Sequence, residues 1–429
     1  MLTISIFAVL LFLIILDLPI VVAIALTAIA FFVGLGQGNF LAMLPQRMYS
    51  GTTGFTLLAI PFFILAGNLM NTGGITSRIF RFARALVGHV PGGLGQVSIV
   101  SSMIFSGMSG SAVADAAGLG QIQHKAMVDN GYEPRVSASI VAAASTIGPV
   151  IPPSIPFVLY GALTTVSVAR LFLAGLVPGV LMGLAMMVAT GILAKVRSYP
   201  RSDRVSLKEI LVSFREAFLP LLAPVIIIGG ILSGIFTPTE ASVVVCIYAI
   251  ILGFLYRDLK LRDLPELFWK SIKQTTALLF IMAAANFFGW LAIYQRIPDN
   301  IIGNLAGISA SGSGVTWIII AVVLILGCFL EGNSIFLITI PIFLPIASQY
   351  GLDLVNLGVV MTLLIMIGNI TPPVGMCLFA VSSFSKVGVM DLARETWPYM
   401  VGILLITILI AFMPEIATFV PNLVMGVSM

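Results

Sequence analysis

Charged side chains are scarce in this sequence. Asp, Glu, Lys and Arg make up 9% of its 429 residues, whereas a soluble domain carries about 25%. A chain with so few charges cannot cover a soluble surface with polar groups. Its apolar content of 59% and mean hydropathy of +1.13 indicate a protein embedded in a membrane. The apolar runs are continuous, which excludes a transmembrane β-barrel. We predict an all-α polytopic membrane protein, a single membrane domain of about ten to twelve hydrophobic elements.

Cysteine and histidine are also scarce, and sequence motifs for catalysis are missing. The three cysteines fall in apolar segments at spacings typical of neither a disulfide framework nor a metal site, and the two histidines are isolated. The sequence has no Walker A motif, no HExxH and no GxSxG. We therefore expect neither an enzyme nor an ATP-driven pump, and no bound cofactor.

The basic residues are few but clustered. Fourteen of the 21 Lys and Arg lie in three stretches, 78–84, 195–215 and 257–273. Basic loops of membrane proteins face the cytoplasm, so we predict these stretches to be cytoplasmic. The alternative, a nucleic-acid-binding patch, would need interleaved aromatic residues and a soluble domain, and both are missing.

Two proline pairs, Pro152-Pro153 and Pro372-Pro373, interrupt apolar segments. Proline breaks a membrane helix, and the freed backbone groups must then find partners in protein or line a cavity. The pairs lie 220 residues apart, and other glycines and prolines recur at that offset: Gly92/Gly312, Gly107/Gly327, Gly131/Gly351, Gly148/Gly368 and Pro178/Pro398. We interpret the two halves as inverted-type repeats of a secondary transporter. The alternative is that both halves merely share a similar composition.

Each half also contains a candidate helical hairpin with a polar tip. Residues 93–137 and 315–350 combine an apolar lead-in, a turn rich in small or polar residues, and an apolar return. The tips are 106–111 and 327–334, and the breaks at the proline pairs are 148–154 and 368–375. We expect re-entrant hairpins whose tips close against the breaks.

The tips and breaks supply the chemistry of an ion-coupled transporter. Unwound backbone exposes carbonyl oxygens that suit Na⁺, and the N-termini of the following half-helices favour an anion such as a carboxylate. The pattern therefore predicts Na⁺-coupled uptake of an organic anion. The candidate contacts for that anion are Ser111, Ser154, Glu331, Asn333 and Asn369. The alternative role for a serine or glycine at these positions is to permit close helix packing.

Asp115, Glu240 and Glu331 are acidic residues in apolar surroundings, where a carboxylate is a functional candidate by default. Glu331 lies at a predicted tip and is the strongest candidate. Asp115 can instead brace its hairpin, and Glu240 in the TPTE stretch can start a helix. Proton coupling through Asp115 or Glu331 is the alternative to Na⁺ coupling.

Several stretches resemble the large membrane subunit of a tripartite ATP-independent periplasmic (TRAP) transporter, the DctM-type family. They are PFFILAGNLM at 61–70, SGSAVADAAGLG at 109–120, IPPSIPF at 151–157, GIFTPTEAS at 234–242 and NITPP at 369–373. The similarity covers essentially the whole chain and is strongest to the sialic-acid branch.

The resemblance implies an elevator mechanism of the ion-transporter superfamily in a bacterial inner membrane, coupled to Na⁺. It implies two partners, a small four-helix membrane subunit and a periplasmic substrate-binding protein. Because the sequence begins directly with large-subunit residues, we expect the small subunit to be a separate chain. Sialic acid (N-acetylneuraminate) is the favoured solute and a C4-dicarboxylate the next. Two further hypotheses stay open, a stand-alone carboxylate transporter coupled to Na⁺ or H⁺, and a channel.

The resemblance also assigns ranges and sites. It implies a scaffold mainly in 1–60 and 195–275 and a transport domain mainly in 90–180 and 310–398. The first implied Na⁺ site, partly built of backbone carbonyls, uses Ser106, Ser109, Gly148, Ile151 and Pro153. The second uses Gly327, Gly368, Thr371 and Val374. Gly107/Gly327, Gly148/Gly368 and Ile151/Thr371 are related by the 220-residue offset.

Overall fold

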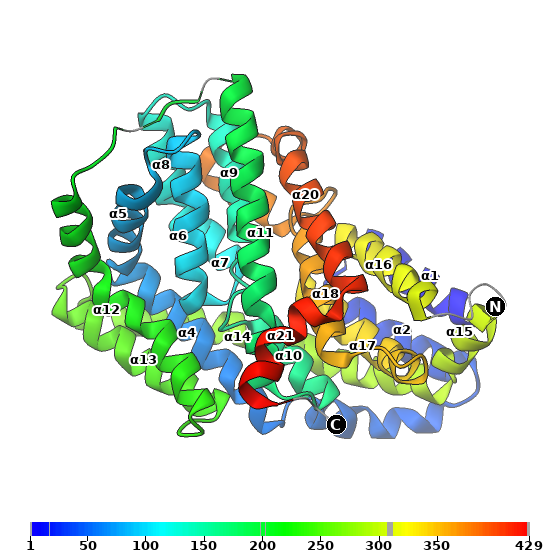
Figure 1. The fold of residues 1–429 in the computed structure, drawn as a ribbon. Helices are drawn as coiled ribbons and strands as arrows, with labels where there is room; N and C mark the ends of the chain where they lie inside the picture. The colour runs from blue at the N-terminus through cyan, green and yellow to red at the C-terminus, as the bar shows by residue number, and fades with distance from the viewer. Residues whose placement is uncertain (1, 17, 198, 202, 307–311, 427–429) are drawn as a thin grey trace.

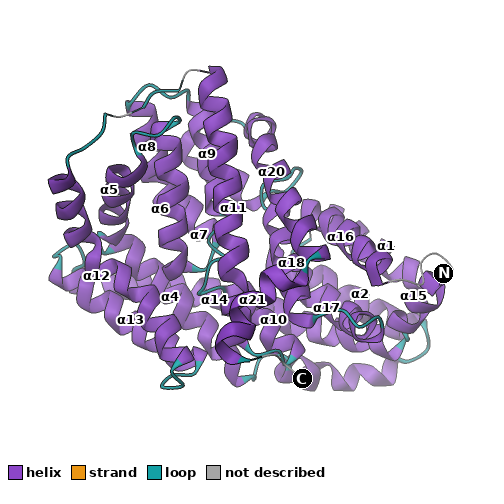
Figure 2. Ribbon diagram, in the orientation of Figure 1, coloured by secondary structure: helices purple, strands orange, loops and turns teal. Residues whose placement is uncertain are grey.

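The computed structural model describes residues 2–16, 18–197, 199–201, 203–306 and 312–426. Some positions in the ranges predicted from the sequence lie outside the described residues. They are 1, 17, 198 and 202 in the scaffold ranges and 310 and 311 in the transport-domain range. Within them the chain forms helices joined by loops, and no strand occurs (Figure 2). The predicted all-α class is confirmed.

The helices follow one another along the chain with the bounds α1 Leu2–Ile15, α2 Ile20–Gly34, η1 Gly38–Met43, α3 Leu44–Ser50, η2 Phe55–Leu58, α4 Ala59–Thr72, α5 Ile75–Val87, α6 Gly93–Ser109, α7 Ala112–Ala117, α8 Leu119–Asp129, α9 Pro134–Ser145, α10 Ile155–Thr164, α11 Val168–Arg197, α12 Leu207–Leu232, α13 Pro238–Leu255, η3 Leu261–Asp263, α14 Leu264–Tyr294, α15 Ile297–Ala306, α16 Gly312–Phe329, α17 Gly332–Gln349, α18 Leu354–Gly368, α19 Met376–Ser385, α20 Val389–Phe412 and α21 Pro414–Met425. In Figure 1, α6 and α11 run side by side, and α4, α12 and α13 form a neighbouring group.

Eight helical segments among the described residues are long and apolar enough to cross a membrane. An apolar helix satisfies all its backbone groups internally, which is why such segments can lie in lipid. The chain is therefore a multi-pass membrane protein. The apolar N-terminal stretch is divided into α1 and α2, and Pro19 immediately precedes α2.

Both candidate hairpins return to the end from which they start. In the first, α6 leads away from Gly92 and α7 and α8 lead back to Tyr132, whose hydroxyl donates to the Gly92 carbonyl at 2.6 Å. Burial raises the pKa of Tyr132 to about 12, so the hydroxyl keeps its proton at neutral pH. In the second, formed by α16 and α17, a Cβ atom added at Gly312 would lie 3.4 Å from the Tyr350 carbonyl.

The helices of the two halves recur in the same order at nearly the same spacing. The pairs are α6 and α16, α9 and α18, α10 and α19, and α11 and α20, whose starting residues lie 219–221 positions apart. Pro152-Pro153 and Pro372-Pro373 both have cis peptide bonds. The inverted relation between the two sets stays a prediction.

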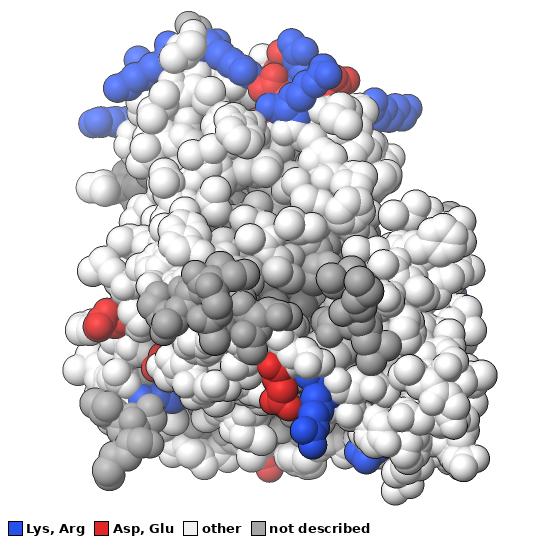
Figure 3. All heavy atoms as spheres, turned by 90° about the vertical axis from the view of Figure 1, so that its right-hand side faces the viewer, with Lys and Arg blue, Asp and Glu red and all other residues white. Residues whose placement is uncertain are grey.

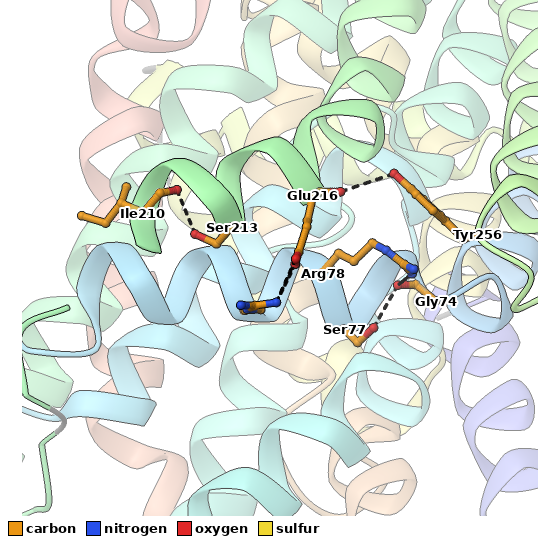
Figure 4. A network of polar contacts seen from close by, with 8 residues as sticks. Gly74, Ser77, Arg78, Ile210, Ser213, Glu216 and Tyr256 are labelled. Atoms are coloured by element: carbon orange, nitrogen blue, oxygen red, sulfur yellow. Dashed lines mark hydrogen bonds and ion pairs between the residues drawn. The ribbon is translucent and has the colours of Figure 1, made fainter. Parts of the chain in front are cut away.

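The three basic stretches meet at one end of the molecule. Arg81 on α5 pairs with Glu216 on α12 at 2.8 Å, and Arg78 pairs with Asp258 at 2.8 Å. Figure 4 shows Arg78, Glu216 and Tyr256 of this network. Tyr256 donates to the Glu216 carbonyl at 3.3 Å and lies under the Arg78 guanidinium. Exposed ion pairs contribute little to stability. The main effect of these contacts is to position α5 against α12 and the segment after α13. Lys and Arg also gather along the upper rim of the face in Figure 3, above a largely uncharged band.

The bond that closes the first hairpin gives a testable prediction. Tyr132→Phe removes the donor to the carbonyls of Gly92 and Pro200, while the Gly92 carbonyl keeps the Gly95 nitrogen as a donor at 2.7 Å. We expect a loss of about 0.5–1.5 kcal/mol in stability, the net contribution of a lost hydrogen bond, measured as a lower thermal midpoint in detergent. Tyr49→Phe, at an exposed tyrosine of α3, is the control and should leave the midpoint unchanged. Equal midpoints for the two variants would show that the bond does not hold the hairpin.

Candidate functional site

The first tip packs directly on the first break. α6 ends at Ser109, and Gly110 turns the chain with a φ of 62°, in the left-handed region that favours glycine. A Cβ atom at Gly110 would lie 2.7 Å from the Pro153 carbonyl oxygen and 3.3 Å from the Ile155 nitrogen. The glycine therefore permits the turn and the close approach of tip to break together.

A buried carboxylate lies between this tip and this break. Asp115 on α7 is 1% exposed and accepts a hydrogen bond from the Ser109 hydroxyl through Oδ1. Its Oδ2 atom has no partner among the described residues and faces Gly148, where an added Cβ would collide with it. An unpartnered buried carboxylate oxygen is costly unless a cation or a proton satisfies it. The sequence left Asp115 either as a functional candidate or as a brace, and the structure places it beside the residues of the first implied Na⁺ site.

The break itself supplies further oxygen atoms. Among the described residues, no hydrogen bond ends on the carbonyl oxygens of Gly148, Ile151 or Pro153. The Ser106 hydroxyl donates to the Ser102 carbonyl at 2.6 Å, which leaves the lone pairs of the Ser106 oxygen free. These oxygens and Asp115 Oδ2 form a set suited to a small hard cation.

The second tip and the second break are also in contact. A Cβ atom at Gly368 would lie 2.7 Å from both Cα and the carbonyl oxygen of Gly327, so the two glycines touch through their backbones. The Val374 nitrogen donates to the Cys328 carbonyl at 3.1 Å. The structure thus brings together residues of the second implied site that are 41–47 positions apart in the sequence.

The second site differs from the first in how its oxygens are used. The Gly368 carbonyl already accepts from the Thr371 nitrogen at 3.0 Å, and the Thr371 hydroxyl donates to the Ile367 carbonyl at 2.7 Å. The carbonyls of Thr371 and Val374 accept no hydrogen bond from the described residues. A carbonyl oxygen has two lone pairs, so Gly368 keeps one acceptor position.

A cavity of about 350 Å³, the first cavity, lies where the two tips and the two breaks face α4 and α14. It is of the size of a small-molecule site. Four of the five candidate substrate residues line it: Ser111, Glu331, Asn333 and Asn369.

Ser154 does not line the cavity. It is fully buried, accepts from the Phe157 nitrogen at 3.2 Å as the N-cap of α10, and donates to the Pro149 carbonyl. Contact of these five with a substrate stays a prediction.

The two other acidic candidates act as helix caps. Glu331 precedes α17 and accepts from the Ser334 nitrogen at 3.3 Å and from the Asn333 amide at 2.7 Å. Glu240 forms a capping box with Thr237 at the start of α13, which confirms its interpretation as a helix start.

Sequence reasoning missed two polar residues of the first cavity. Asn68 on α4 donates to the Ser271 hydroxyl at 2.8 Å and to the side-chain amide oxygen Oε1 of Gln274 at 2.9 Å. Asn68 and Gln274 both line the cavity. The sequence feature that could have identified Asn68 is its place inside the apolar stretch 61–70, because polar side chains in membrane helices mark functional positions.

Comparison with known proteins identifies the family of this chain. The family "Tripartite ATP-independent periplasmic transporter, DctM component" matches residues 7–416. The chain is 40% identical to the sialic acid TRAP transporter large permease protein SiaM of Vibrio cholerae, over 95% of this chain and 96% of SiaM. It is 41% identical to the sialic acid TRAP transporter permease protein SiaT of Haemophilus influenzae, over 88% of this chain but only 62% of SiaT. The C4-dicarboxylate TRAP transporter large permease protein DctM of Pseudomonas aeruginosa is 41% identical over 88% of each chain.

Solved structures show the same fold at low sequence identity. The YdaH transporter of Alcanivorax borkumensis superposes with a TM-score of 0.64 at 14% identity, over 88% of this chain and 89% of YdaH. MtrF of Neisseria gonorrhoeae superposes with a TM-score of 0.55 at 16% identity, over 87% of this chain and 83% of MtrF. The family match covers nearly the whole chain, and the TRAP permeases named above are about 40% identical to it. The protein therefore belongs to the DctM family of TRAP transporter large permeases.

Proposed function

We propose that this chain is the permease of a Na⁺-coupled importer of an organic anion, with N-acetylneuraminate as the favoured solute. The observation that carries the proposal is the convergence of helix N-termini on the first cavity. The first residues of α10, α17 and α19, represented by Ile155, Gly332 and Met376, all line it. Helix N-termini present N–H groups and partial positive charge, which favours an anion.

One Na⁺ ion binds at each of the two junctions between a hairpin tip and its break, so the chain binds two in all. The support is the set of unpaired carbonyls in both breaks and the unpartnered Oδ2 atom of Asp115. Carbonyl oxygens coordinate Na⁺ but do not carry protons, so they favour sodium over proton coupling. Glu331 is engaged as a helix cap, which makes it less suited to a proton relay.

The names of the relatives support a carboxylated solute. SiaM and SiaT are described as sialic acid permeases and DctM as a C4-dicarboxylate permease, and all of these solutes carry carboxylates. Identity alone does not separate the two classes, because both lie near 40%. SiaM matches over a larger share of both chains, which favours N-acetylneuraminate, and a C4-dicarboxylate is the alternative.

The proposed transporter works in a bacterial inner membrane with a periplasmic substrate-binding protein and a small membrane subunit. The family description supports this proposal because it names a tripartite periplasmic system. The first cavity lies between two groups of helices. One side is α4 and α14, which continue from the scaffold ranges 1–60 and 195–275, and the other is formed by the tips and breaks of 90–180 and 310–398. This placement supports an elevator in which the second group slides along the first and carries Na⁺ and the anion with it.

Uptake by reconstituted protein tests the proposed function. Proteoliposomes containing this chain, its small membrane subunit and the solute-loaded binding protein should accumulate radiolabelled N-acetylneuraminate only under an inward Na⁺ gradient. A parallel assay uses labelled succinate. Uptake at full rate by this chain alone would contradict the tripartite proposal, and uptake that follows pH and ignores Na⁺ would contradict sodium coupling.

Single hydroxyl deletions test the cation sites. Ser106→Ala and Thr371→Ala each remove one side-chain oxygen from a proposed site. We expect each to raise the Na⁺ concentration for half-maximal uptake about tenfold while the folded protein persists. Thr362→Ala is the matched control, because Thr362 is fully buried and bonds only within α18. An unchanged Na⁺ dependence in both site variants would rule out the oxygen set proposed here.

A further inference from the structure

A second cavity, of about 170 Å³, follows the first one along α14. Gln274 and Leu278 of α14 line the first cavity, and Asn286 and Trp290 of the same helix line the second. With a rise of 1.5 Å per residue, the two groups are centred about 15 Å apart. The cavities are therefore consecutive spaces along one helix.

Two other helices also line both cavities. α10 contributes Ile155 to the first cavity and Leu163 to the second, and α17 contributes Asn333 to the first and Leu337 to the second. α14 begins at Leu264, within the basic stretch 257–273, whose Asp258 pairs with Arg78 on α5. The second cavity thus lies toward the end of α14 that is away from the basic stretches, which is the predicted periplasmic end.

Arg47 on α3 gives the second cavity a positive charge. Its guanidinium carbon lies 5.0 Å from the centre of the Trp290 ring, and no ion pair joins Arg47 to an acidic side chain among the described residues. A guanidinium stacked on an aromatic face keeps its N–H edge available to an oxyanion. Phe32 and Phe40 hold the Trp290 ring at centroid distances of 4.9 and 5.3 Å.

Asn286 supplies an amide beside this cation. Its side chain forms no hydrogen bond among the described residues and lines the second cavity. A Cβ atom at Gly51 would lie 2.6 Å from Asn286 Cβ, so only glycine lets the segment after α3 approach α14 this closely. The packing therefore sets a guanidinium and a free amide around one space.

We propose that the second cavity is a capture site for the carboxylate of the transported anion on its way to the first cavity. Arg47 provides the charge and Asn286 a further donor. Among the described residues that line the first cavity, none is Lys or Arg. An anion that moves from the second cavity to the first would therefore meet the positive charge of Arg47 before it reaches the first cavity. A positively charged cleft raises the local concentration of an anionic solute. The inference rests on the proposed function, because it presumes that an anion uses the first cavity.

Trp290 fluorescence tests the capture site. The exposed Trp269, Trp317 and Trp397 are replaced by Phe, and the full chain is placed in phosphatidylcholine nanodiscs. Titration with sodium N-acetylneuraminate, and separately with sodium succinate, at constant Na⁺ and ionic strength should change the Trp290 emission saturably. Arg47→Gln should raise the half-saturating concentration about tenfold or abolish the response, and Arg47→Lys should lie between.

Arg296→Gln is the matched control, because it removes the same charge from an exposed residue just after α14 that does not line the cavity. It should respond like the parent protein. No saturable response to either carboxylate in the parent, or the same response in Arg47→Gln, would overturn the capture site.

A lipid headgroup is the competing occupant, and two further arms separate it from the carboxylate. If phosphatidylglycerol nanodiscs without carboxylate give the emission change and carboxylate adds nothing, the cavity holds a headgroup and the proposal fails. The uptake assay with wild-type protein runs in parallel. Na⁺-driven uptake without a fluorescence response rejects only the capture site, whereas a fluorescence response without Na⁺-driven uptake rejects the coupling.

Discussion

The structure depends on one constraint, which is that backbone polar groups removed from water must have partners. The proline pairs violate it locally, because proline cannot donate and its ring ends the preceding helix. The protein meets the constraint in part through local turns within the breaks and, in the second half, through the bond from the Val374 nitrogen to the Cys328 carbonyl of the tip. A hairpin tip packs onto each break. Gly110 against Pro153, and Gly327 against Gly368, are the contacts that allow this approach. The carbonyls that still lack donors can then be satisfied by cations.

The same arrangement accounts for the proposed selectivity. Chain breaks create both free carbonyls and new helix starts, so the proposed cation sites and the proposed anion site lie side by side and depend on one feature. Ser109, Asp115 and Gly148 form the clearest example, since they join a tip, a short helix and a break. In the proposed mechanism, solute and coupling ions would share the same tips and breaks, and binding of one would stabilise the conformation that binds the other.

The sequence predicts much of the fold because its strongest signals are local. The apolar runs, the proline pairs and the glycines at hairpin starts report on backbone conformation within a few residues. Asn68 beside Gln274 and Arg47 beside Trp290 were out of reach, since these contacts join α4 and α3 to α14 across more than 200 residues. Ser154 shows the converse limit, because a serine before a half-helix reads equally as a ligand and as the N-cap that the structure shows.

The central claim is that each tip and break together bind one sodium ion. Equilibrium binding of radioactive sodium to the purified chain tests it most directly, with Ser106→Ala and Thr371→Ala measured alongside. The account predicts two sites in the wild-type protein, with each variant weakening a different one. A single site, no saturable binding, or two sites that neither variant affects would contradict it.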